Sequence, residues 1–432
     1  MAARRRPAVI SIKLRSSREV AASRTERDLI GELEVPARAL YGIRTVRSMR
    51  NLGFSGRVLG AYPSYVRALA IVKKAAAQAN RDARVITAKN AAAIESACDA
   101  LIAGKYLDQF LVDVLGGGGG IAVNMNLNEV IANLANECLG GARGDYDPID
   151  PRLHLNASQS TADVCHTAAH IAILDEWIDL RRMLGSCIGA AQAKAEQFRG
   201  IRTLARTCLR DASATSLGEL FGAHAAALKR RMLELDRAVA MLRKVNLGGT
   251  VIGDRSGASA AYRRSVIRHL NRIAKHKLEL RENLFDAAQN CDDLGAVAAQ
   301  LGLLAEVLIK VAQDLRLLSS GPEGGFGEIS LPAVMEGSSF YPGKINPVMP
   351  ETLIQCCFQV LGCERASRLA LERGELNLNI FEGAAAINVM DAMEMLALAL
   401  PIFTESCLSG ITANEARCRK LASFGSKGGK HR

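Results

Sequence analysis

One segment near residue 340 carries side-chain types that together could move a proton. Ser338, Lys344 and Asn346 lie close together, and Gly337 and Gly343 stand among them. A serine is a weak base unless backbone N–H groups and a nearby cation stabilise its alkoxide. Glycines permit the tight turn that presents such N–H groups. The alternative is an ordinary surface loop, which Gly-Ser-Ser alone would favour.

The chemistry that suits this set is removal of a proton from a carbon beside a carboxylate. The resulting carbanion carries two negative oxygens, which preorganised donors and cations stabilise best. Glu351 follows Pro347 and Pro350 at the start of an expected helix. A negative charge there stabilises the helix by about 0.3–1 kcal/mol. A helix-stabilising role and a catalytic role for Glu351 are compatible.

Long helices are expected on both sides of this loop. Residues 319–350 are rich in Gly, Ser and Pro and form the longest expected loop, and loops of this length are usually functional. Apolar residues before it alternate spacings of three and four, which is typical of a heptad seam that packs against partner helices. The seam consists of Leu294, Val297, Leu301, Leu304, Leu308, Val311, Leu315 and Leu318. A second seam consists of Leu228, Met232, Leu235, Val239 and Leu242.

Further helical patterns cover most of the remaining chain. They span residues 65–110, 164–198 and 351–400, and helix is expected to resume near Asn128 after the loop Gly116–Gly120. The sequence therefore predicts a mainly α protein built as an antiparallel bundle of long helices. The expected parts are a basic disordered tail (1–23), an N-terminal helical domain with the Gly-rich loop (24–160), a central long-helix bundle with loop 319–350 (161–405) and a short C-terminal remnant (406–432).

Composition excludes several classes of protein. The net charge of +11 is concentrated partly at the chain ends, which lack the aromatic residues that stack on bases, so we expect no nucleic-acid partner. No uninterrupted apolar run reaches the ~18 residues of a membrane span, so we expect no membrane partner. The acid-free, Arg-rich first 18 residues fit a disordered tail better than a transit peptide, because they show no amphipathic stripe.

Cysteine and histidine spacing gives no metal site. The 11 cysteines are odd in number and form no C-x-x-C pair, which indicates reduced thiols, a cytoplasmic protein and no structural zinc. His166 and His170 stand four residues apart on an expected helix, where they could hold a metal. Because no third ligand is evident, a role on the helix face or in the core is favoured.

Four segments give the chain a family resemblance. They are Glu26–Thr45 with its Val35-Pro36 and Tyr41-Gly42 pairs, Asn124–Val130, Ser158–Thr161 and Gly337–Pro347. Together these segments resemble the aspartase/fumarase superfamily over residues 24–418. Pro347–Glu351 and Gly410–Asn414 favour the aspartases over the fumarases.

The resemblance implies a fold, a reaction and a site. It implies a long-helix bundle that assembles as a homotetramer with a multi-subunit helical core, and a cofactor-free lyase that forms fumarate and ammonia reversibly from L-aspartate. Segments from three subunits would meet in each site. The implied catalytic residues are Ser338 as the base, Glu351 and Thr207. The implied residues that bind the dicarboxylate are Lys344, Asn346, Ser160, Thr161 and Asn126.

The sequence departs from the family pattern at four of these positions. Ile121 and Ala122 replace two hydroxyl residues, Ala162 replaces an asparagine, and Cys208 replaces a histidine. Each lost hydrogen bond to a charged group is worth about 1.5–3 kcal/mol. We expect Cys208 to be a buried, inert thiol, because a nucleophilic thiol needs a nearby base. The small helical domain that follows Gly410–Asn414 in the family is also not evident.

Three functions are therefore compatible with the sequence. The first is an aspartate-specific ammonia-lyase. The second is a catalytically impaired homologue with a binding or assembly role, which the substitutions favour and the intact Ser338, Lys344, Asn346 and Glu351 oppose. The third is a lyase of the same family that acts on a different substituted succinate.

Overall fold

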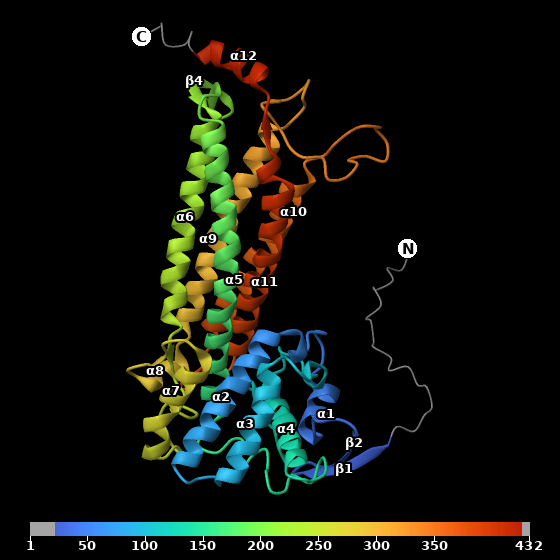
Figure 1. Cartoon of the computed structure of the whole chain (residues 1–432), viewed down its shortest axis with the longest axis vertical. Coiled ribbons are helices and arrows are strands. Elements are labelled where there is room, and N and C mark those ends of the chain that lie inside the picture. Colours follow the sequence, from blue (N-terminus) through green and yellow to red (C-terminus); the bar gives the residue numbers. More distant parts are fainter. Residues whose placement is uncertain (1–21, 426–432) are drawn as a thin grey trace, which may run out of the picture.

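The computed structural model describes residues 22–425, which are mostly helical (Figure 1). The α-helices are α1 (Ile43–Asn51), α2 (Pro63–Asp82), α3 (Ala88–Ile102), α4 (Ile121–Cys138), α5 (Thr161–Gln197), α6 (Leu217–Met241), α7 (Ala260–Ala274), α8 (Leu284–Gln289), α9 (Asp292–Leu318), α10 (Val348–Glu372), α11 (Glu382–Ser406) and α12 (Glu415–Gly425). The strands are β1 (Ser23–Asp28), β2 (Gly31–Pro36), β3 (Arg202–Thr207), β4 (Arg210–Ser216), β5 (Lys244–Val245), β6 (Glu279–Leu280), β7 (Ile329–Ser330) and β8 (Thr412–Ala413). They form two-stranded pairs: β1–β2, β3–β4 and β7–β8 are antiparallel, and β5–β6 is parallel.

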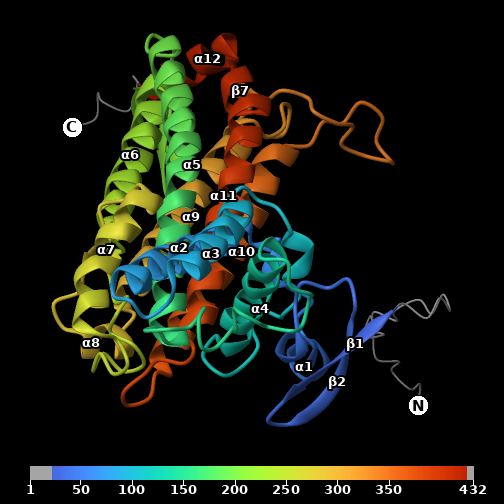
Figure 2. The same ribbon diagram turned by 60° about the horizontal axis from the view of Figure 1, so that its bottom comes forward.

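Five long helices, α5, α6, α9, α10 and α11, form the bundle, and both views show them side by side (Figures 1 and 2). The predicted seam from Leu294 to Leu318 lies on α9, and all eight of its residues are buried. The second seam lies on α6 and its end, where only Met232 is partly exposed. Both predicted seams therefore pack inside the protein, and the mainly α fold is confirmed.

Helix α5 sets the length of the bundle. Its 37 residues span roughly 55 Å at 1.5 Å per residue. It begins with a capping box, in which the Ser160 hydroxyl accepts from the Asp163 backbone N–H and the Asp163 carboxylate accepts from the Ser160 backbone N–H. Asp163 also accepts from the backbone N–H groups of Gly248 and Thr250. This carboxylate therefore fixes both the start of α5 and a neighbouring loop.

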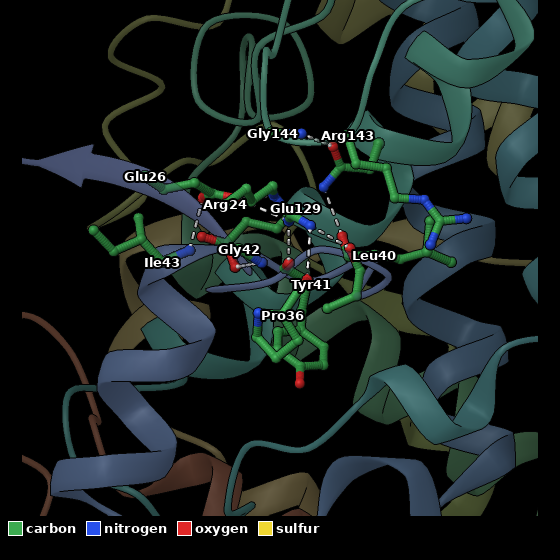
Figure 3. Close-up of polar contacts among 12 residues, drawn as sticks. Arg24, Glu26, Pro36, Leu40, Tyr41, Gly42, Ile43, Glu129, Arg143 and Gly144 are labelled. Atoms are coloured by element: carbon green, nitrogen blue, oxygen red, sulfur yellow. Dashed lines mark hydrogen bonds and ion pairs between the residues drawn. The ribbon is translucent and has the colours of Figure 1, made fainter. Parts of the chain in front are cut away.

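Two buried carboxylates fix the start of α1 in the N-terminal part of the chain (Figure 3). Glu129 on α4 accepts from the backbone N–H groups of Gly42, at 2.8 Å, and of nearby residues. Glu26 on β1 accepts from the Ile43 N–H at 2.9 Å. A Cβ at Gly42 would lie 2.1 Å from the Tyr146 hydroxyl oxygen, so this position requires glycine.

Four predicted boundaries were wrong, and one of them is the predicted block 65–110, which is two helices, α2 and α3. Helix α4 begins at Ile121 rather than near Asn128, because Gly120, at φ +88°, ends the glycine run as the N-cap of α4. The predicted block 351–400 is two helices, since Gly374 and two nearby asparagines favour a turn between them. The predicted tail lies outside the described residues except at its end, where Ser23 already belongs to β1.

Two described helices, α9 and a stretch that includes α11, are long and apolar enough to cross a membrane by length and composition alone. The requirement for an uninterrupted apolar run excluded these two stretches, because a few polar residues interrupt each stretch. About half of each apolar stretch is buried inside the chain. This burial is typical of core helices, and α9 contacts α6, α10 and α11.

Candidate active site

The loop between β7 and α10 stands out from the side of the bundle and carries Ser338 (Figures 1 and 2). The Ser338 Oγ atom accepts hydrogen bonds from the backbone N–H groups of Phe340, at 3.1 Å, and Tyr341, at 2.9 Å. A turn with backbone N–H donors of this kind was predicted from the sequence as the condition for a stabilised serine alkoxide. The geometry therefore suits Ser338 to hold negative charge on its oxygen.

Two residues near the end of the loop close it on itself. The Gly337 N–H donates to the Lys344 carbonyl at 2.8 Å, and the Asn346 side-chain amide donates to the Gly337 carbonyl. A Cβ at Gly337 would lie 2.5 Å from backbone atoms of Lys344 and Asn346, so only glycine fits there. Lys344 is exposed, and its Nζ lies 5.9 Å from the centre of the Tyr341 ring. The loop that carries Ser338 thus also carries an exposed cation.

Glu351 lies in the first turn of α10, as predicted, and pairs with Arg316 at 3.2 Å. Lys344, Asn346 and Glu351 line one open pocket of about 740 Å³. The structure brings these three predicted residues together. Ser338 and Thr207 are not among the residues that line this pocket.

A second region lies at the start of α5. The Asn124 side-chain amide donates to the Thr161 hydroxyl and to the Asn156 carbonyl oxygen, both at 3.0 Å. The Lys73 ammonium donates to the same Asn156 oxygen at 3.2 Å. Ser160, directly before Thr161, is the helix cap described above. The hydroxyls of Ser160 and Thr161 are therefore held in place by a polar network.

Three members of this network, Lys73, Asn124 and Asn156, were not predicted as site residues. Lys73 is fully buried on α2, and burial lowers its pKa to about 8. Its place in an Ala-rich helix gave no signal of this contact. Burial also raises the pKa of the Asp163 carboxyl, although three backbone N–H groups donate to it.

The predicted substrate-binding residue Asn126 lies on α4, two residues after Asn124, but its side chain takes no part in this network. It is fully buried. Its side-chain oxygen accepts from the Leu111 N–H at 3.1 Å, and its side-chain NH2 group donates to the Gln109 carbonyl at 3.0 Å. Both polar ends of its side chain are therefore used to fix the segment before the glycine run. In this chain Asn126 positions backbone and does not face an open pocket.

The substituted positions Ile121, Ala122 and Ala162 lie around the glycine run. Ala122 and Ala162 line a small pocket of about 160 Å³ with Gly116–Gly120. Ile121 and Ala122 also line an open, mainly apolar groove of about 650 Å³. Most of the exposed area around the start of α4 is therefore apolar, although Arg44, Arg47 and Arg152 also line the groove.

Thr207 and Cys208 lie at the tip of the β3–β4 hairpin, next to α12 (Figure 1). Cys208 and Leu209 form a two-residue turn in which both φ angles are positive, at 51° and 58°. The prediction of a buried Cys208 was wrong, because this turn exposes the thiol to solvent. Glu328, another residue that the sequence did not single out, is buried, pairs with Arg206 and accepts from the Thr203 hydroxyl, so it holds strand β3 of the hairpin.

A single chain does not bring together the start of α5 with Thr161, the hairpin with Thr207 and the loop with Ser338. Thr161 begins α5, whereas the hairpin with Thr207 follows the other end of that helix, roughly 55 Å away along its axis. Ser338 lies between β7 and α10, in the segment that projects from the bundle (Figure 1). Among residues 22–425, no hydrogen bond or ion pair joins any two of these three side chains.

Comparisons with known proteins agree on the family. A family model described as lyase matches residues 31–362. The aspartate ammonia-lyase of Pseudomonas aeruginosa is 43% identical over 406 residues, which cover 93% of this chain and 85% of that protein. That of Bacillus subtilis is 39% identical over 397 residues, covering 92% and 83%.

Solved structures show the same fold. A fumarate lyase:delta crystallin from Brucella melitensis bound to cobalt superposes with a TM-score of 0.91 at 44% identity, covering 92% of this chain and 87% of that one. A class II fumarase from Schistosoma mansoni superposes with a TM-score of 0.89 at 27% identity, covering 93% and 87%. The expected long-helix fold is confirmed by both.

Proposed function

The chain belongs to the lyase family of the aspartase/fumarase superfamily, and we propose that it is an ammonia-lyase that converts L-aspartate reversibly to fumarate and ammonia. The observation that carries this proposal is the geometry of Ser338, whose oxygen accepts two backbone N–H donors in a loop that also holds Lys344 and Asn346. Relatives that are aspartate ammonia-lyases at 38–43% identity support a carbon–nitrogen lyase.

The mechanism assigns each residue a role. The Ser338 alkoxide takes a proton from the carbon beside the side-chain carboxylate of aspartate, and the electron pair spreads onto two carboxylate oxygens. Lys344 and Asn346 stabilise that charge as cation and amide donor. The carbon–nitrogen bond then breaks, ammonia leaves and fumarate forms. Ser160 and Thr161 bind the substrate, and Thr207 and Glu351 complete the catalytic set.

We propose a homotetramer in which each site takes its three regions from three copies. Their separation within one chain supports this arrangement. Apolar side chains of the projecting loop support it too, because Phe340 is 78% exposed and Tyr341 61% exposed, and a partner subunit would cover them. Eleven free thiols fit a reducing compartment, which supports a cytoplasmic protein.

The apolar groove beside Ile121 and Ala122 favours a second candidate, a lyase for a succinate with a more apolar substituent. Absorbance at the band of the unsaturated product tests both candidates, with purified protein and a panel of substituted succinates that includes aspartate. Turnover of aspartate supports the first candidate, and turnover of another member alone supports the second. No product from any member would indicate the impaired homologue with a binding or assembly role.

A further inference from the structure

Three potential metal ligands meet where α5, α9 and α11 come together. His166 lies on α5, Cys291 directly precedes α9, and Glu382 is the first residue of α11. One ligand atom from each lies within 4.8 Å of the other two. His166 and Cys291 are almost fully buried, and Glu382 is partly buried. The proposed lyase chemistry uses none of the three.

The hydrogen bonds of this cluster join one nitrogen of His166 to Glu382 and leave the other without a partner. The Glu382 carboxylate can only accept, so the His166 Nδ1–H donates to it. The other ring nitrogen, Nε2, is buried and has no hydrogen-bond partner within residues 22–425. An unpartnered buried polar atom costs about 1–3 kcal/mol. Because Nδ1 is the nitrogen that faces Glu382, an ion shared with that carboxylate would bind at Nδ1 in place of its proton, and the proton would move to Nε2.

The neighbouring residues supply charge and orientation. His170 packs against His166 with ring centres 4.1 Å apart, and its Nδ1–H donates to the Leu242 carbonyl at 3.1 Å. Its Nε2 faces the buried Asp293 carboxylate at 3.6 Å, and Arg281 pairs with that carboxylate. With a thiolate, the carboxylates of Glu382 and Asp293 and the Arg281 cation, a divalent ion would bring the net charge of the cluster to zero.

We propose that His166, Cys291 and Glu382 form a three-ligand site for a divalent transition metal of the zinc class. One nitrogen, one sulfur and one oxygen donor suit such an ion, and three protein ligands leave its fourth position open. Glu382 also lines the 160 Å³ pocket beneath the glycine run, which has room for a water or a small anion as fourth ligand. Binding releases the proton of the Cys291 thiol to solvent.

The sequence could not reveal this site. His166 and Glu382 are 216 residues apart, so no spacing motif joins the ligands, and only the packing of three helices does. A bound ion would cross-link these helices and stabilise the fold by mass action.

Cobalt(II) titration of the full-length, chelator-treated protein tests the proposal. Thiolate ligation should give a sulfur-to-cobalt charge-transfer band that saturates at one ion per chain and disappears when zinc is added. The band should be absent in Cys291→Ser. His166→Gln and Glu382→Gln should weaken binding by about 10-fold or more. Cys187→Ser, which changes a buried cysteine elsewhere on α5, should keep the band.

Two results would overturn the site. One is a parent protein without a charge-transfer band, and the other is a Cys291→Ser protein that is folded by circular dichroism and gives the same band. If that variant does not fold, denaturant unfolding of the parent decides: zinc should raise the midpoint, and an unchanged midpoint contradicts the proposal.

Discussion

Ser338 illustrates how single residues acquire chemistry from their surroundings. Its side chain is an ordinary hydroxyl, but two backbone N–H groups point at its oxygen. The turn that aims these donors depends on Gly337, where a side chain would collide with Lys344 and Asn346. The proposed base, cation and amide therefore lie in one short segment, and this is why local sequence was enough to predict them as a set.

Replacing the proposed base should remove turnover. Ser338→Ala should lower kcat for aspartate by about 100- to 10,000-fold, the usual range for a lost acid–base group, without a loss of stability. The neighbouring, exposed Ser339→Ala is the matched control and should keep the parent rate. Fumarate absorbance measures both. A Ser338→Ala protein that turns over at the parent rate would exclude Ser338 as the base.

The substituted positions should limit activity on aspartate. Restoring the donors together, as Ile121→Thr, Ala122→Ser, Ala162→Asn and Cys208→His, should raise kcat/KM by at least ~100-fold, or about 2.7 kcal/mol of transition-state binding. Each single change should do much less, because the donors act on one substrate. A folded fourfold variant that gains nothing would show that these positions do not contact the substrate.

Lys73 should give stability an unusual dependence on pH. Its folded pKa, lowered to about 8 by burial, lies below the unfolded value, so folding favours the neutral amine. Between the folded pKa and the unfolded pKa of about 10.4, Lys73 is protonated in the unfolded chain but not in the folded one. The free energy of unfolding should therefore rise from pH 8 to about pH 10.4. Below pH 8 Lys73 is charged in both states, and its burial lowers the free energy of unfolding by a constant amount of about 3 kcal/mol.

The comparison of the parent with Lys73→Met isolates this group from the other groups that titrate. Urea unfolding at pH 7.5 and pH 9.5 should show the free energy of unfolding of the parent rising relative to that of the variant. Equal changes in the two proteins would mean that Lys73 stays charged in the fold.

At the scale of the elements, local spacing in the sequence predicted the helical seams. It did not predict contacts between segments that are distant in the sequence. The α9 seam was predicted because its spacing is local, and all of it is buried. The contacts of Lys73 with Asn156 and of His166 with Glu382 join distant segments, which no local pattern records. The Cys208 turn lacks the Gly or Asn that usually marks such a hairpin, so its exposure could not be read from the sequence.

The α9 seam allows a matched test of core packing. Leu304 is fully buried and its neighbour Leu303 is 40% exposed. Leu304→Ala should lower the free energy of unfolding by about 2–5 kcal/mol, because it leaves a cavity among the bundle helices. Leu303→Ala should cost much less if that face is open to solvent. Denaturant unfolding measures both, and equal losses would mean that a partner subunit covers Leu303.

At the scale of the whole molecule, the chain presents surfaces that it does not itself cover. Phe358 on α10 and Leu398 and Ile402 on α11 are each more than half exposed, on helices of the bundle. Exposed apolar side chains on these helices would be covered by partner subunits in the proposed homotetramer. The proposed chemistry also needs the projecting loop of one copy to meet the start of α5 in another.

Complementation between two inactive variants tests this account most directly. Ser338→Ala and Thr161→Ala each damage a different region, so each homo-oligomer should form fumarate from aspartate far more slowly than the parent. The two variants are unfolded and refolded together in equal amounts. Random assortment of the copies should then leave about a quarter of the sites with an intact Ser338 from one copy and an intact Thr161 from another. The account predicts that fumarate absorbance recovers to about a quarter of the parent rate. A mixture that contains mixed oligomers yet stays as inactive as either variant alone would contradict a site shared between subunits.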